Sequence, residues 1–314
     1  MLTELELSAG SSDPVLTNHG VQQAQRLGQY FGNAGIAFTH LFSSNLKRAV
    51  KTAEIVRSHQ RPADASSSTR DEEVPQILQT PLIREQDFGW YEGKSYVEHP
   101  YRSALRDRRE HRDEGFVDME PIELVAVRVD NFLDEHLFPL LDGGGMETKM
   151  SIVAVVSHGI ALAQIWKRLL LRLSADSLKV RPALLTTIGH FNPQRLGGWH
   201  NTGFLELDFN RNSFVPVAVP LAQDSAKVTA LSVDTTTSIS ISPESETRNL
   251  IQPVTNVTSV STAFRMLDGW ITTVNTINGT SHLEGLKRTG GGVGSAAHDE
   301  KQRTIDTFFE KRNL

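Results

Sequence analysis

The chain has 314 residues, of which 39% are hydrophobic and 22% are charged, with a formal net charge of −5 and no cysteine. The absence of cysteine excludes disulfides, thiolate metal sites and cysteine nucleophiles, and the negative charge argues against a whole-molecule electrostatic grip on nucleic acid or acidic lipid. No apolar run reaches the roughly 18 residues that span a bilayer, and the N-terminus does not resemble a signal peptide, so we expect an intracellular protein, cytoplasmic or nuclear, with no membrane and no direct nucleic-acid partner.

The folded part of the chain alternates predicted helices and strands. Thr17 is expected to cap the first helix, and Ser44 or Asn45 the second. In chain order, the expected elements are a helix over 14–32, a strand over 38–43, a helix over 45–57, an exposed loop over 59–76, a solvated helix over 98–115, a helix over 121–141, a buried strand over 151–156, a helix over 160–171, and strands over 184–192 and 202–209. Strands that alternate with helices predict an α/β fold with a mostly parallel sheet.

The composition changes after about residue 222, where Ser, Thr and Val dominate without a helical period. Such a segment is typical of disorder. The glycine run at 290–294 has no strand before it and no helix after it, which indicates a linker rather than a phosphate-binding loop. We therefore expect a folded domain over 1–215, a low-complexity tail over 216–300 and a separate short peptide over 301–312.

Three stretches place polar side chains just after strand-like segments. FSSNLKRAVKTAE carries Arg48, PLIREQDFGWYEG carries Glu85, and VVSHGI carries His158. Taken singly, Arg48 could be a surface arginine, and Glu85 could pair with Arg84 or with a helix end. His158 could be an imidazole satisfied by backbone groups. Ligands of α/β enzymes bind at the carboxyl ends of strands, and a guanidinium beside helix N–H groups favours a phosphate oxyanion. The joint occurrence therefore indicates a phosphate site.

These motifs, together with LTNHGVQQAQRLG, resemble the histidine phosphatase superfamily, the phosphoglycerate mutase-like phosphatases, over residues 8–210. The resemblance implies a three-layer α/β sandwich with a mostly parallel central sheet and helices on both faces. It implies a hydrolase of small phosphomonoesters that needs no metal and no cofactor. It also implies that Arg48 clamps the phosphoryl oxygens, that His158 hydrogen-bonds the same group, and that Glu85 protonates the leaving group. Phosphoryl transfer depends mostly on positioning and charge stabilisation, which suits these residue types.

The resemblance further implies a nucleophilic histidine in an Arg-His-Gly motif at the end of the first strand, and this motif does not occur in the sequence. Residues 1–18 contain no histidine, and His19 lies at the entry to the first helix, downstream of the expected position. We expect the family's first strand to lie upstream of Met1 or to be poorly replaced by residues 2–7. Two explanations stay open: a truncated product of a working phosphatase, which we favour because the other site residues are kept, or a degenerate pseudophosphatase that binds phospho-ligands. Either way, phosphatase activity should be weak or absent.

Residues 301–312, KQRTIDTFFEKR, form a second candidate site. Gln302, Ile305, Phe308 and Phe309 give a pattern that resembles the PIP box, the peptide by which eukaryotic proteins bind the sliding clamp PCNA. One helical turn would present Ile305, Phe308 and Phe309 together as an apolar plug. The resemblance implies a eukaryotic, at least partly nuclear protein that acts as a clamp-binding adaptor. The alternative is an amphipathic C-terminal helix that packs on the folded domain.

Overall fold

The structure, a computed structural model, describes residues 10–60, 74–93, 116–142, 150–174, 176–211, 266–287 and 296–299. All of them belong to one compact unit, which joins the chain up to Arg211 with the chain from Arg265 onward. The predictions for residues 2–7, for the helix over 98–115, for the glycine run and for the peptide over 301–312 fall outside the described residues. Within the described ranges, no helix is both long and apolar enough to cross a membrane.

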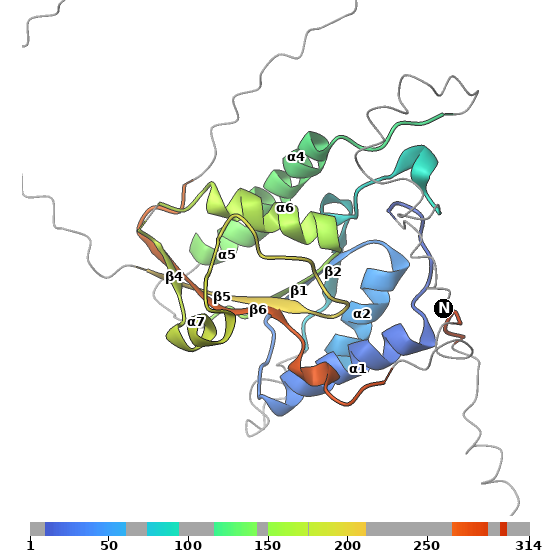
Figure 1. The fold of residues 1–314 in the computed structure, drawn as a ribbon, viewed down its shortest axis with the longest axis horizontal. Helices are drawn as coiled ribbons and strands as arrows, with labels where there is room; N and C mark the ends of the chain where they lie inside the picture. Colours follow the sequence, from blue (N-terminus) through green and yellow to red (C-terminus); the bar gives the residue numbers. More distant parts are fainter. Residues whose placement is uncertain are drawn as a thin grey trace, which may run out of the picture. The chain divides into compact units, whose positions relative to one another are not determined.

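Two three-stranded sheets organise this unit (Figure 1). The helices are α1 (Asn18–Asn33), α2 (Lys47–Ser58), α4 (Ile122–Phe132), α5 (Phe138–Asp142), α6 (Gly159–Leu170) and α7 (Pro182–Ile188). The strands are β1 (His40–Ser44), β2 (Ile77–Thr80), β3 (Val153–Val156), β4 (Leu178–Val180), β5 (Phe204–Arg211) and β6 (Trp270–Gly279). The first sheet has the order β2-β1-β3 and is parallel throughout. The second has the order β4-β6-β5, with β4 parallel and β5 antiparallel to β6.

Alternate residues of the first sheet enter two different cores. Phe42 and Val155 pack in the core formed with α4 and α6. Leu41 and Ala154 pack in the core formed with α1 and α2. Because successive side chains of a strand point to opposite faces, helices cover both faces of this sheet. The arrangement confirms the expected layered α/β fold with a parallel sheet.

The first two helices begin differently. Thr17 caps α1 as predicted, since its Oγ1 accepts a hydrogen bond from the Gly20 N–H at 3.1 Å. The prediction for α2 was wrong: Leu46 occupies the N-cap position and contributes no side-chain hydrogen bond. Ser44 instead ends β1, and its Oγ accepts from the Leu46 N–H at 3.3 Å. The Ser44 hydroxyl thus links the end of β1 to the start of α2.

The helix predicted over 121–141 is present with an irregular middle. After α4, residues Leu133–Leu137 form a π-helical turn, and α5 then continues to Asp142. Pro139 lies in α5 and has no N–H to donate to the preceding turn. A local change of hydrogen-bond spacing accommodates that missing donor.

Residues 182–188 form a helix, so the strand predicted over 184–192 was wrong. The β-branched residues of LLTTI suggested a strand, but the proline before this run and the glycine after it specify a helix. Pro182 stands at its first turn, where a fixed φ is favourable. Gly189 follows its end with φ of 70°, a conformation that favours glycine.

Strand β6 lies inside the segment predicted to be a low-complexity tail. Residues 266–287 differ from that prediction, because Trp270–Gly279 pairs with both β4 and β5. Its centre is buried, with Val274 fully inaccessible. The alternating, β-branched run ITTVNTI is a strand signal, but it is short compared with the polar segment that precedes it.

Strand β3 is less buried than its sequence predicts. All four residues of Val153–Val156 are half-buried. Within the described part of the chain, β3 pairs only with β1 and forms one edge of its sheet. A continuous apolar strand of this kind is typical of a position between two neighbours, so its pattern overestimated the burial.

Candidate functional site

The sheet order brings the three predicted site residues together. Arg48 follows β1, Glu85 follows β2 and His158 follows β3, so all three lie at the carboxyl edge of the parallel sheet. Arg48 Nε donates to His158 Nδ1 at 3.2 Å. The Glu85 carboxylate accepts from the N–H groups of Ile160 and Ala161, at 3.3 and 3.2 Å, in the first turn of α6. The helix that begins after His158 therefore holds Glu85.

His158 is held through both of its ring nitrogens. Arginine can only donate, so Nδ1 must be the accepting nitrogen in the bond with Arg48. Nε2 then carries the proton and donates to Ser44 Oγ at 2.9 Å. The side chain is 8% exposed. Burial, and then the positive charges of Arg48, Arg128 and Arg84, lower the pKa of His158 to about 3, so the ring is neutral at physiological pH.

The pKa of Glu85 shifts upward, whereas that of His158 shifts downward. Burial raises the pKa of Glu85, while hydrogen bonds from the backbone of Gln86, Ile160 and Ala161 and the charge of Arg48 partly offset that effect. A carboxyl group with a raised pKa holds a proton nearer to neutral pH. That property is the one required of a general acid.

Arg48 already has oxygen acceptors in this structure. Its two terminal nitrogens donate to the carbonyl oxygens of Ser12 and Gly10, at 2.8 and 2.9 Å. Burial lowers the pKa of Arg48, and the carboxylates of Glu85, Asp13 and Glu92 oppose that shift. An incoming anion would have to replace these carbonyl oxygens on the guanidinium.

Glu92 holds the loop that supplies those carbonyls. Its carboxylate accepts from three successive N–H groups, those of Gly10 at 3.0 Å, Ser11 at 2.7 Å and Ser12 at 3.2 Å, and from Phe88 at 2.9 Å. Successive amides of this kind form an anion-binding concavity. Burial alone would raise the pKa of Glu92, but hydrogen bonding by the Ser12 side chain and by the backbone of Phe88, Ser11 and Ser12 outweighs it and lowers the pKa. A Cβ at Gly10 would collide with the backbone carbonyl of Gln86 and with the Glu92 carboxylate, so the loop needs glycine there.

Arg128 positions the segment that carries Glu85. From α4 it donates to the carbonyl oxygens of Leu82, Arg84 and Glu85, at 3.0, 2.6 and 3.1 Å. Its Nε pairs with Glu120 at 2.9 Å. The sequence prediction omitted Arg128 and Glu92. A single arginine within the apolar helix IELVAVRVDNF is a signal for the first, and the WYEG stretch beside the Glu85 motif is a signal for the second.

The remaining candidates lie apart from this cluster or outside the description. His19 is in the first turn of α1, as its sequence position indicated. The predicted partner-binding residues Gln302, Ile305, Phe308 and Phe309 are outside the described residues. Among the side chains that are described, no group of three or more His, Asp or Glu could hold a metal ion.

The chain is similar to a known protein family, to individual proteins of known sequence and to solved structures. The profile of the histidine phosphatase superfamily (branch 1) matches residues 3–199. The chain is 30% identical over 202 residues to a probable phosphoglycerate mutase GpmB of Proteus mirabilis, which covers 60% of this chain and 80% of that protein. It is 31% identical over 135 residues to fructose-2,6-bisphosphatase TIGAR B of Danio rerio, covering 42% of this chain and 47% of that one, about half of that relative. A solved structure of mycobacterial glucosyl-3-phosphoglycerate phosphatase with inorganic phosphate matches with a TM-score of 0.45 and 20% identity, over 65% of this chain and 85% of that one.

Proposed function

Because the chain belongs to the histidine phosphatase superfamily (branch 1), we propose that it binds the phosphoryl group of a small phosphomonoester without a metal ion. Arg48 clamps the phosphoryl oxygens, His158 donates a hydrogen bond to the same group, and Glu85 protonates the leaving oxygen. The sequence contains no Arg-His-Gly nucleophile. We therefore propose weak hydrolysis or none, and a phospho-ligand-binding role where hydrolysis is absent.

The convergence of Arg48, Glu85 and His158 at one edge of the parallel sheet carries this proposal. Three polar side chains from three separate segments meet there, linked by the Arg48–His158 hydrogen bond and by the charge interaction between Arg48 and Glu85. A half-buried guanidinium beside a neutral imidazole and a protonatable carboxyl offers positive charge, a neutral hydrogen-bond donor and one transferable proton. Charge-assisted hydrogen bonds of this kind stabilise a phosphoryl dianion.

Binding exchanges one set of acceptors for another. The oxygens of the ligand replace the Gly10 and Ser12 carbonyls as acceptors of the Arg48 hydrogen bonds. Each of these two hydrogen bonds then joins a cationic donor to an anionic acceptor. The His158 Nε2–H turns from the Ser44 hydroxyl to a phosphoryl oxygen. Each displaced group is neutral, and the ligand oxygen is anionic, so the exchange favours the ligand electrostatically.

The Arg48→Ala variant tests this site by titration calorimetry with inorganic phosphate and vanadate. Loss of charge-assisted hydrogen bonds should weaken binding by about ten- to a hundredfold. Arg26→Ala, which removes an exposed arginine from α1, is the matched control and should bind like the wild type. Equal affinity of the wild type and Arg48→Ala would contradict the proposal. In an aryl phosphate assay, robust turnover that survives His158→Ala would contradict the assigned roles.

The second candidate function, clamp binding through residues 301–312, rests on the spacing of Gln302, Ile305, Phe308 and Phe309. A peptide of this segment should bind PCNA in surface plasmon resonance. Replacing Phe308 and Phe309 by alanine removes most of the apolar plug, and should weaken binding by more than about tenfold. If the original and the doubly substituted peptides bind equally poorly, the candidate is wrong.

A further inference from the structure

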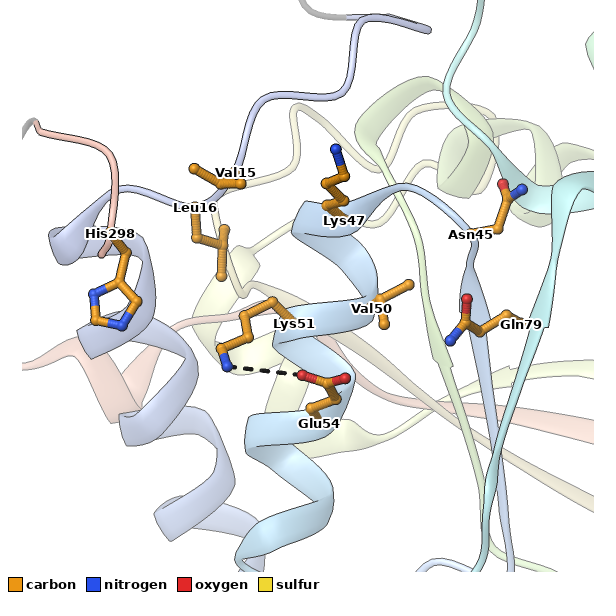
Figure 2. A pocket seen from close by; sticks show the side chains of 9 residues that line it. All are labelled: Val15, Leu16, Asn45, Lys47, Val50, Lys51, Glu54, Gln79 and His298. Carbon is orange, nitrogen blue, oxygen red and sulfur yellow. Dashed lines mark ion pairs between the residues drawn. The ribbon is translucent and has the colours of Figure 1, made fainter. Parts of the chain in front are cut away.

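A groove of about 370 Å³ runs along the first turns of α2 (Figure 2), and neither Arg48 nor His158 is among the residues that line it. We call it the α1–α2 groove. Its wall includes Val15, Leu16, Val50, Lys51, Glu54 and His298. The apolar part is accessible, since Val15 is 47% exposed. Figure 2 shows Leu16, Lys51 and His298 around the space between the two helices.

Residues 296–299 are fixed to one end of this groove. The N–H of Asn18, the first residue of α1, donates to the Ala296 carbonyl at 3.1 Å, and the His298 N–H donates to the Leu16 carbonyl at 2.9 Å. Thr17 and Ala297 form an antiparallel bridge, and His298 Nδ1 lies 2.8 Å from Asn18 Oδ1. The segment therefore supplies an acceptor to a helix N-terminus, where free N–H groups need partners. It also contributes His298 to the groove wall.

The peptide 301–312 follows this anchor almost directly. Ile305 is the seventh residue after His298, and the extended chain between the two spans up to roughly 23 Å. A peptide tethered so closely has an effective concentration at the groove on the order of millimolar. It carries the apolar residues Ile305, Phe308 and Phe309. Its charged residues are two acidic ones, Asp306 and Glu310, and four basic ones, Lys301, Arg303, Lys311 and Arg312.

The apolar part of the groove matches the apolar residues of that peptide. Val15, Leu16 and Val50 offer an apolar surface. The lysines of the wall are paired with carboxylates, Lys51 with Glu54 at 3.8 Å and Lys47 with Asp13 at 3.9 Å, so the apolar surface is the part that favours the peptide. We propose that the α1–α2 groove binds residues 301–312 of the same chain, with Ile305, Phe308 and Phe309 against the apolar wall. While it is bound there, the peptide is withheld from any other partner. This inference is independent of the phosphate site.

Hydrogen–deuterium exchange of the full chain tests the docking. The amides of residues 304–309 should exchange about tenfold more slowly in the full chain than in a synthetic peptide of residues 299–314. Val15→Glu, which places a carboxylate on the exposed apolar wall, should abolish that protection, as should Phe308→Ala with Phe309→Ala. Val127→Glu is the matched control, because Val127 is 55% exposed on α4, and it should keep the protection.

Three outcomes would overturn the proposal. The first is exchange in the full chain as fast as in the peptide. The second is protection that survives Val15→Glu, which would place the peptide elsewhere. The third is protection that rises with protein concentration, which would assign the docking to a second copy. The melting temperature of each variant, measured by circular dichroism, separates loss of docking from loss of folding.

Discussion

Asp130→Ala is expected to lower the free energy of unfolding by about 3–5 kcal/mol, because it leaves a buried cation without its main partner. Asp130 Oδ1 accepts from Arg172 at 2.7 Å and from Arg168 at 2.8 Å, and its Oδ2 lies 2.6 Å from Arg168. The Arg172 side chain is completely inaccessible. These contacts join α4 to the last turn of α6, the helix that begins directly after His158, and to Arg172 just beyond its end. Urea denaturation at neutral pH measures the loss.

Asp134→Ala is the matched control for that variant. Asp134 also pairs with Arg172, at 3.3 Å, but its side chain is 44% exposed. Its removal should cost less than about 1 kcal/mol. The double change Asp130→Leu with Arg172→Met should recover part of the lost stability, because it removes the unpaired charge of Arg172, the more deeply buried of the two arginines that Asp130 pairs with. Equal losses for Asp130→Ala and Asp134→Ala would contradict this account.

The convergence of Arg48, Glu85 and His158 was predictable because the three residues obey a rule of parallel sheets. Arg48, Glu85 and His158 each follow a strand-like segment, and the carboxyl ends of parallel strands share one edge. Their family motifs gave the same assignment. The contacts that complete the site were not predictable in this way. Glu92 and the Gly10 loop lie far apart in the sequence, and a hydrogen bond between them leaves no periodic pattern.

The errors in the fold prediction come from competition between local signals. The run LLTTI favours a strand by side-chain type, but Pro182 and Gly189 define a helix around it. Strand β6 was predicted as part of the low-complexity tail because the polar segment before it dominates the composition. Its pairing with β4 and β5 is long-range, so local composition does not reveal it. The burial of β3 depends on what pairs with its second edge, and four apolar residues cannot specify that neighbour.

His158 should make the protein sensitive to acid well before its own ring is protonated in the folded state. The pKa of His158 is lowered to about 3 by burial and nearby arginines, and an unfolded histidine titrates near about 6.5. Between these values the unfolded chain binds one proton more than the folded chain does. Stability from this residue is therefore fully present above pH about 6.5 and falls by about 1.4 kcal/mol per pH unit below it.

The expected loss at pH 4.5 is about 2–3 kcal/mol relative to pH 7, and it should be absent in His158→Asn. Glu85, whose pKa is raised by burial, acts in the opposite direction, because the folded state binds its proton more readily as the pH falls. That contribution is present in both proteins, so the difference between their urea-denaturation pH profiles isolates the imidazole. An NMR titration of the folded chain should show no protonation of His158 between pH 5 and 8. A midpoint near 6.5 would mean that the ring can take a proton on Nδ1, which is incompatible with its acceptance of the Arg48 hydrogen bond and thus with the geometry proposed for phosphate binding.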